Sequence, residues 1–268
     1  MDDQTGVKKY KVEVWSNQAI DQKTDSIAEE LPIALVYNDV SHAVMMATPT
    51  ELEAFAIGFS LSEGIIKNLN EIYDIQIDSH PEGVEVALTL SNQRFSELKD
   101  RRRSITGRTG CGICGSESLQ QVRLTSNPVS AYVEVSHSAI NNAVAELTDK
   151  QPLQAKTGAV HGAAWCNSEG KIIEICEDIG RHNALDKLIG TMARKEMLIA
   201  GTLNAGFVLV SSRASYEMVQ KTAMINASVL VAVSAATTMA IELAEQLGIS
   251  LIGFARDKRH VTYVRSSK

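Results

Sequence analysis

The sequence is poor in cysteine, proline and aromatic residues, and each shortage narrows the class of protein. Four of its 268 residues are cysteine, five are proline, and aromatic residues make up 5%. Four cysteines are too few for a disulfide-stabilised scaffold, whereas 44% hydrophobic residues are too many for a disordered chain. With few aromatics the core must be mainly aliphatic, which favours an α/β protein. A chain of this length folds as one large domain or two small ones.

The chain also lacks an excess of positive charge and a long apolar run. Its formal net charge is −6, which disfavours a nonspecific nucleic-acid binder. The most apolar stretch, 227–243, is interrupted by Ser234, Thr237 and Glu242 and is too polar to cross a bilayer. Residues 1–4 have neither the basic nor the apolar part of a secretory signal. We therefore expect a cytoplasmic protein without nucleic-acid or membrane partners.

Hydrophobic periodicity predicts two units separated by a basic segment. Residues 1–100 form an α+β unit, in which Thr48 and Pro49 are the expected N-cap and first residue of a helix. Residues 101–136 have no apolar period, and we expect a glycine-rich loop and connector there. Residues 137–268 follow the order α-β-β-α-β-α-β-α-β-β. That order predicts an α/β domain with a mixed, mostly parallel sheet in three layers.

The basic segment carries a cysteine pair, Cys111 and Cys114. Within Lys99–Gly115 there are four glycines and five Lys or Arg residues. A C-x-x-C pair fits a zinc site, a thioredoxin-like redox pair, or a nucleophilic thiol that carries a transferred group. A zinc site usually needs a second close pair, but Cys166 and Cys176 lie on predicted apolar strands, where free cysteine is usually buried. The arginines stabilise a thiolate and the glycines expose it, which favours the nucleophile.

Several predicted strands of the second unit end in hydroxyl or cationic side chains. In open α/β sheets, ligands bind beyond the carboxyl ends of the strands. Hydroxyl groups, helix N–H groups and arginines at such ends can bind phosphate, while the alternative is ordinary capping and solvated charge. The candidate residues are Arg181, His182, Ser211, Arg213, Arg256 and Arg259.

The element order of the second unit is similar to that of the cytidine deaminase fold, which raises the alternative of a zinc hydrolase. That chemistry needs an H-x-E and a P-C-x-x-C signature. His161 is followed by Gly162-Ala163 and not by a glutamate, and Gly110 stands where a proline should precede Cys111. The fold can therefore be similar while the metal site is absent, and we expect no metal ligands.

Five segments together closely resemble the FdhD family, sulfurtransferases needed to activate formate dehydrogenase. The segments are 32–38, 58–66, 107–115, 177–187 and 211–218. The resemblance extends over nearly the whole chain, from about Val12 to Tyr263. It implies a cytidine-deaminase-like fold for the second unit and a homodimer.

The resemblance also implies a mechanism and a set of site residues. A cysteine desulfurase hands sulfur to Cys111 as a persulfide, and Cys114 is an assisting thiol. The sulfur is then delivered to the molybdenum (or tungsten) bis-molybdopterin guanine dinucleotide cofactor of formate dehydrogenase, which is a bound substrate. The family's cofactor-binding segment matches Phe254, Ala255, Arg256, Asp257, Lys258 and Arg259. A chaperone that only holds the cofactor or the dehydrogenase is the alternative from another class.

Overall fold

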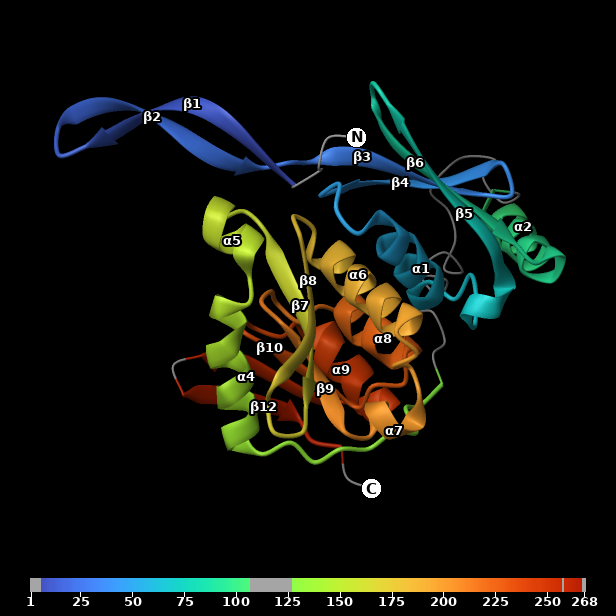
Figure 1. Ribbon diagram of the computed structural model, residues 1–268. Helices are drawn as coiled ribbons and strands as arrows, with labels where there is room; N and C mark the ends of the chain where they lie inside the picture. Colours follow the sequence, from blue (N-terminus) through green and yellow to red (C-terminus); the bar gives the residue numbers. More distant parts are fainter. Residues whose placement is uncertain (1–5, 107–126, 257, 267–268) are drawn as a thin grey trace.

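The computed structural model describes residues 6–106, 127–256 and 258–266, with the backbone alone described at 101–106 and at residue 200. Within these ranges the strands form a two-stranded, a four-stranded and a six-stranded sheet (Figure 1). None of the helices in the described ranges is long and apolar enough to cross a membrane.

The first part of the chain forms an arm and the four-stranded sheet. The arm is an antiparallel hairpin of β1 (Val7–Ser16) and β2 (Ala19–Ala28) that extends away from the rest of the molecule (Figure 1). The sheet has the order β4-β3-β6-β5. Its strands are β3 (Leu31–Tyr37), β4 (Val40–Ala47), β5 (Ile72–His80) and β6 (Gly83–Leu90). The helical elements of this part are α1 (Leu52–Ser62), the 3-10 helix η1 (Leu69–Glu71) and α2 (Asn92–Thr106).

Two expectations for this part of the chain are wrong. Thr48 is not the N-cap of α1, which is Glu51. Thr48 instead donates its backbone N–H and its hydroxyl to the buried carboxylate of Asp178, at 3.0 and 2.8 Å. The expected loop does not begin at residue 101, since α2 continues to Thr106. Lysine and arginine have high helix propensity, so a run of them extends a helix as readily as it forms a loop.

The second part of the chain forms the six-stranded sheet, with the order β12-β11-β10-β9-β7-β8. Its strands are β7 (His161–Asn167), β8 (Ile172–Asp178), β9 (Gly206–Val210), β10 (Val229–Ala232), β11 (Ser250–Arg256) and β12 (Arg259–Val264). The helices are α4 (His137–Asp149), α5 (Pro152–Thr157), α6 (Arg181–Arg194), α7 (Ala200–Leu203), α8 (Tyr216–Met224) and α9 (Thr238–Leu247). One buried cluster joins α4 to one face of the sheet, and another joins α6, α8 and α9 to the opposite face. This part therefore has the expected three layers.

The six-stranded sheet is mixed, but the expectation that it is mostly parallel is wrong. Only the pairs β9–β10 and β10–β11 are parallel, and the other three pairs are antiparallel. Parallel neighbours need a long crossover, which α8 and α9 supply. The pairs β7–β8 and β11–β12, at the two ends of the sheet, are hairpins, and a hairpin makes its two strands antiparallel.

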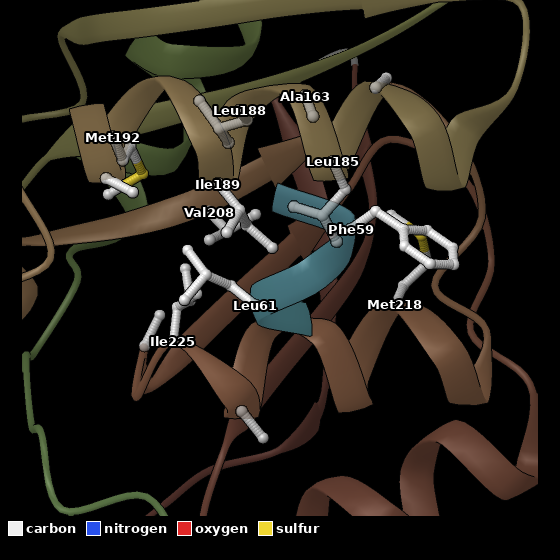
Figure 2. Packing of buried hydrophobic residues seen from close by; sticks show 14 of the residues in the cluster. Phe59, Leu61, Ala163, Leu185, Leu188, Ile189, Met192, Val208, Met218 and Ile225 are labelled. Carbon is white, nitrogen blue, oxygen red and sulfur yellow. The ribbon is translucent and has the colours of Figure 1, made fainter. Parts of the chain in front are cut away.

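Helices α1 and α6 join the two sheets through direct backbone contact at two glycines. A Cβ added at Gly58 would lie 1.7 Å from the carbonyl oxygen of Asp186, and one at Gly190 would lie 1.8 Å from that of Ala54. A single buried cluster continues from the four-stranded sheet through α1 and α6 to the six-stranded sheet. Figure 2 shows side chains of α1, α6, α8 and β9 meeting within this cluster. The division of the chain at residues 101 and 137 stays a prediction.

Candidate functional site

The ends of several strands meet at one edge of the six-stranded sheet, which we call the carboxyl edge. It contains the residues that follow β8, β9, β10 and β11, together with the first residues of β7, because β7 runs antiparallel to its neighbours. Ser211 follows β9, accepts the backbone N–H of Gly162 at its Oγ (2.9 Å) and donates its own backbone N–H to the Gly162 carbonyl (2.9 Å). His161 pairs with Asp178 at the end of β8. The fold thus brings together segments that lie fifty residues apart in the chain.

Helices α6 and α8 both begin at the carboxyl edge without a side-chain cap. The N-cap of α6 is Gly180, which has no side chain, and the side chain of the α8 N-cap, Ser215, forms no capping bond. The N-cap of α9, Thr237, differs because its hydroxyl accepts the N–H of Ala240. The first-turn N–H groups of α6 and α8 are therefore suited to bind an anion, which the helix dipole also favours.

Arg181 and His182 occupy the first turn of α6. The Nε of Arg181 is buried and has no hydrogen-bond partner in the described part of the chain. The Nε2 of His182 lies 2.6 Å from Oε2 of Glu217, in the first turn of α8. Burial lowers the pKa of His182, with Arg181 acting in the same direction and Glu217 opposing both. The edge thus holds an unsatisfied guanidinium nitrogen, a feature that fits an anionic ligand.

The end of β11 is irregular where the resemblance places the cofactor-binding segment. Phe254 has a φ of 51°, which is strained for a bulky side chain, and it donates its N–H to the carbonyl of Ser234 after β10 (2.9 Å). The register with β12 is interrupted between Gly253 and Arg256. The guanidinium of Arg256 lies 5.7 Å from the centre of the Phe254 ring. A bulge at this point turns an aromatic ring and a cation together at the edge.

The other predicted cofactor-binding residues divide into exposed and buried ones. Arg213, Lys258 and Arg259 are exposed and carry positive charge at the ends of β9 and β11. Ala255 is fully buried in the cluster beneath α4, so its side chain is not available to a ligand. Ala255 belongs to β11 and packs in the core, and its place in the predicted cofactor-binding segment did not reveal this burial. Cys111, Cys114 and Asp257 lie outside the described residues.

Several polar residues of the segment 177–187 form buried contacts that stabilise the fold, and the sequence pattern did not separate them from candidate ligand-binding residues. Lys187 Nζ lies 2.7 Å from Asp178 Oδ2, and both side chains are fully buried. Lys187 also donates to the hydroxyl (2.6 Å) and the carbonyl (3.1 Å) of Thr48. The other oxygen of Asp178 accepts the N–H of Gly180 (2.8 Å) and the side-chain amide of Asn183 (3.0 Å). This pair fixes the start of α6 and thereby the positions of Arg181 and His182.

A second buried ion pair attaches α8 to the same framework. Lys221 Nζ lies 3.0 Å from Asp186 Oδ1 and 3.0 Å from Glu63 Oε1, and Ser62 donates its hydroxyl to Asp186 (2.6 Å). Burial opposes the charge of Lys221, but the two carboxylates outweigh it and raise its pKa. The two helices without a side-chain cap, α6 and α8, are therefore both tied to α1 and the residues that flank it.

The two cysteines of the sheet are confirmed as buried core residues. Cys166 and Cys176 are 0% and 2% exposed. Burial raises the pKa of Cys176 to about 12 and raises that of Cys166 as well. No group of three His, Cys, Asp or Glu side chains that could hold a metal ion is found in the ranges 6–106, 127–256 and 258–266.

Comparisons with known proteins place the chain among relatives that match nearly all of it. The model of the FdhD/NarQ family matches residues 28–268. The sulfur carrier protein FdhD of Cupriavidus necator is 49% identical over 259 residues, which cover 97% of this chain and 88% of the relative. The proteins of the same name from Variovorax paradoxus and Acinetobacter baylyi are 47% and 48% identical, over 92% and 89% of this chain and 87% and 86% of theirs.

A solved structure supports the fold. The crystal structure of a protein assigned as a formate dehydrogenase accessory protein, from Desulfotalea psychrophila, aligns with a TM-score of 0.72. The alignment covers 96% of each chain at 23% sequence identity. At that identity the likeness shows a shared mixed α/β fold.

Proposed function

Because this chain belongs to the FdhD/NarQ family, we propose that it is a sulfur carrier that serves formate dehydrogenase. In this proposal it is a sulfurtransferase that takes sulfur from a cysteine desulfurase as a cysteine persulfide. It delivers the sulfur to the molybdenum (or tungsten) bis-molybdopterin guanine dinucleotide cofactor, which is its bound substrate. The observation that carries the proposal is the match, over about nine-tenths of the chain, to relatives that are each named sulfur carrier protein FdhD.

The sulfur step needs no outside oxidant. The thiolate of Cys111 attacks the terminal sulfur of the donor persulfide, a new S–S bond forms at Cys111, and the donor cysteine leaves as a thiolate. Attack of the Cys114 thiolate on the Cys111 sulfur then forms a disulfide and releases hydrosulfide, and a dithiol reductant must restore the pair. Five Lys or Arg residues within 99–115 favour the thiolate and persulfide anions.

The carboxyl edge is the proposed binding surface for the cofactor. The uncapped N-termini of α6 and α8, with Arg181 and Arg213, suit its phosphates. The ring of Phe254 and the guanidinium of Arg256 suit a flat guanine base.

We also assign the domain to the cytidine-deaminase-like class, an assignment supported by a β-hairpin followed by two parallel crossovers in three layers.

The proposed partners are the desulfurase, formate dehydrogenase and a second copy of the chain, all in the cytoplasm. The homodimer is supported by the arm of β1 and β2, because Trp15 and Ile20 lie opposite each other near its tip and are 71% and 65% exposed. A two-stranded hairpin is marginally stable by itself. A partner surface that covers this pair would stabilise the arm.

Intact-mass spectrometry tests the sulfur step directly. The full chain is incubated with a cysteine desulfurase and cysteine, and the peptide that contains Cys111 is expected to gain one sulfur atom. The gain should disappear in Cys111→Ala, while guanine-nucleotide binding persists. No gain in the unmodified chain would favour the chaperone alternative. Stoichiometric zinc bound through Cys111 and Cys114 would favour the zinc hydrolase.

Calorimetric titration with guanosine 5′-diphosphate (GDP) tests the edge. Arg256→Ala or Arg259→Ala should weaken binding roughly tenfold, the equivalent of about 1.4 kcal/mol, since a charged hydrogen-bond donor is lost. The matched control is Arg194→Ala, at the opposite end of α6, where the arginine pairs with Glu53. If Arg256→Ala and Arg259→Ala bind GDP as tightly as the control Arg194→Ala, the carboxyl edge is removed from the proposal.

A further inference from the structure

Two histidines from distant parts of the chain form a hydrogen-bonded pair between α4 and β12. His137 is the first residue of α4, and His260 is the second residue of β12. The Nδ1 of His137 lies 2.6 Å from the Nε2 of His260. The ring centres are 4.8 Å apart, so the facing nitrogens and not the ring faces make the contact. The pair therefore links the start of α4 to an edge strand of the six-stranded sheet.

The hydrogen bond between the two rings depends on their protonation. An N–H of one imidazole must donate to the lone pair of the other, so at least one of the two facing nitrogens has to lack a proton. The pair can take up one extra proton, because an imidazolium donates a strong hydrogen bond to a neutral ring. A second extra proton makes both facing nitrogens donors and places two positive charges beside each other. The observed contact is therefore incompatible with two charged rings.

The positions of the two rings add to the cost of the second charge. His137 stands at the N-terminus of α4, where the helix dipole disfavours a positive side chain. The Nδ1 of His260 is buried and has no hydrogen-bond partner within the described ranges, so an N–H at this atom is left unsatisfied. Burial and the neighbouring His137 both lower the pKa of His260. Each ring thus resists a charge when the other already carries one.

The charged side chains around the pair do not compensate two positive rings. The pair lies at a hollow of about 210 Å³ between the segment 132–135, α4 and the strands β10, β11 and β12. Besides the two histidines, the charged residues that line it are Glu134, before α4, and Arg265, after β12. The lining residues from β10 and β11 are uncharged. Arg259, the exposed residue before His260, adds another positive charge.

The strand β12 depends on contacts outside its own sheet pairing. It is an edge strand, so β11 is its only neighbour in the six-stranded sheet. Register shifts interrupt that pairing between Leu251 and Ile252 and again between Gly253 and Arg256. Strands with few ladder hydrogen bonds open locally at a low free-energy cost. The contact with α4 therefore helps to hold the start of β12 in place.

We propose that His137 and His260 form a pH-sensitive latch, which holds the start of β12 against α4 until both rings are charged. An unperturbed imidazole gains its proton near pH 6.5, so the latch is closed at neutral pH and opens below about pH 6. Opening changes the order of the hairpin that carries Arg256 and Arg259. The latch goes beyond the proposed function and does not depend on it.

Histidine NMR of the isotope-labelled full chain tests the pairing. His137 and His260 should take up their protons in two coupled steps, separated by more than about one pH unit. In His137→Gln the remaining ring, His260, should titrate in a single step, because the glutamine side chain cannot be charged. His80→Gln, at the exposed end of β5, is the matched control and should leave both steps unchanged.

Hydrogen exchange followed by mass spectrometry measures the opening. After correction for the intrinsic effect of pH, exchange in peptides that contain β12 should rise roughly tenfold from about pH 7.5 to about pH 5, the equivalent of a pKa shift of one unit. The rise should be absent in His137→Gln, since two charged rings cannot form there. It should persist in the control His80→Gln.

The latch is overturned if both rings titrate independently in the unmodified chain, or if the exchange of β12 has no additional pH dependence. An equal rise of exchange in His137→Gln would also overturn it. If His137→Gln does not fold, His260→Gln takes its place, with His137 as the observed ring. Neither sulfur loading nor GDP binding enters this test, so failure of the latch leaves the proposed function standing.

Discussion

The buried pair of Asp178 and Lys187 offers a direct test of how the fold supports the carboxyl edge. Lys187→Met keeps the aliphatic stem and removes the ammonium group, 2.7 Å from a carboxylate that is fully buried. Removing one partner of a buried pair costs about 3–5 kcal/mol of unfolding free energy, because the other charge is left uncompensated. Asp178 would retain hydrogen bonds from Thr48, Gly180 and Asn183. We therefore expect the lower end of that range, about 3 kcal/mol.

Urea unfolding followed by circular dichroism measures this loss as a shift of the midpoint. The double variant Asp178→Asn/Lys187→Met should recover part of the stability, since it leaves no uncompensated charge. Lys195→Met is the matched control, because Lys195 caps the same helix and pairs with Glu174 on the surface. Exposed pairs contribute at most about 1 kcal/mol. The reasoning fails if the Lys187 and Lys195 variants are equally stable.

Other predictions concern the helix contact, the histidine and the core cysteines. Gly58→Ala or Gly190→Ala should lower the unfolding free energy by roughly 2–3 kcal/mol, because each methyl group would meet a carbonyl oxygen of the other helix; unchanged urea midpoints would contradict this. Since burial lowers the pKa of His182, the unfolded chain binds its proton more readily. The unfolding free energy should therefore fall as the pH drops below about 6.5, and His182→Gln should reduce that slope; equal slopes would refute it. Alkylation of the native chain at mildly alkaline pH should spare Cys166 and Cys176, as mass spectrometry can show, and rapid labelling of either would contradict their burial.

Hydrophobic patterns in the sequence predicted the helices and strands that bury apolar side chains at regular intervals. The apolar runs Leu31–Tyr37 and Gly206–Val210 form β3 and β9, and most of their side chains are buried. The strand β2 was not predicted, because Ala19–Ala28 is almost wholly exposed and mostly polar, so it has no burial alternation to detect. The six-residue α5 was also missed, since one turn and a half carries too little periodicity. The order of helices and strands predicted a mostly parallel sheet. That order does not reveal that β7 pairs with β9 in the antiparallel direction.

The site shows the same division between local and non-local information. The motif segments identified the family, and strand ends rich in arginine and serine identified the edge where Arg181, Ser211 and Arg256 lie. Only the tertiary structure revealed that Ser211 meets Gly162, because the antiparallel pairing of β7 with β9 joins residues that lie 49 positions apart in the chain.

The amino-acid sequence by itself determined the chemistry that the chain carries: a basic, glycine-rich segment with two cysteines, and cationic strand ends in an otherwise acidic protein. Only the tertiary structure decided which charges of the segment 177–187 are buried in pairs and which stand at the carboxyl edge. Asp178 and Lys187 are buried together with Thr48, whereas Arg181 and His182 stand at the start of α6. The physical reason is that Asp178 and Lys187 are both buried against Thr48, which lies more than a hundred residues earlier in the chain, so the segment 177–187 alone does not encode their burial.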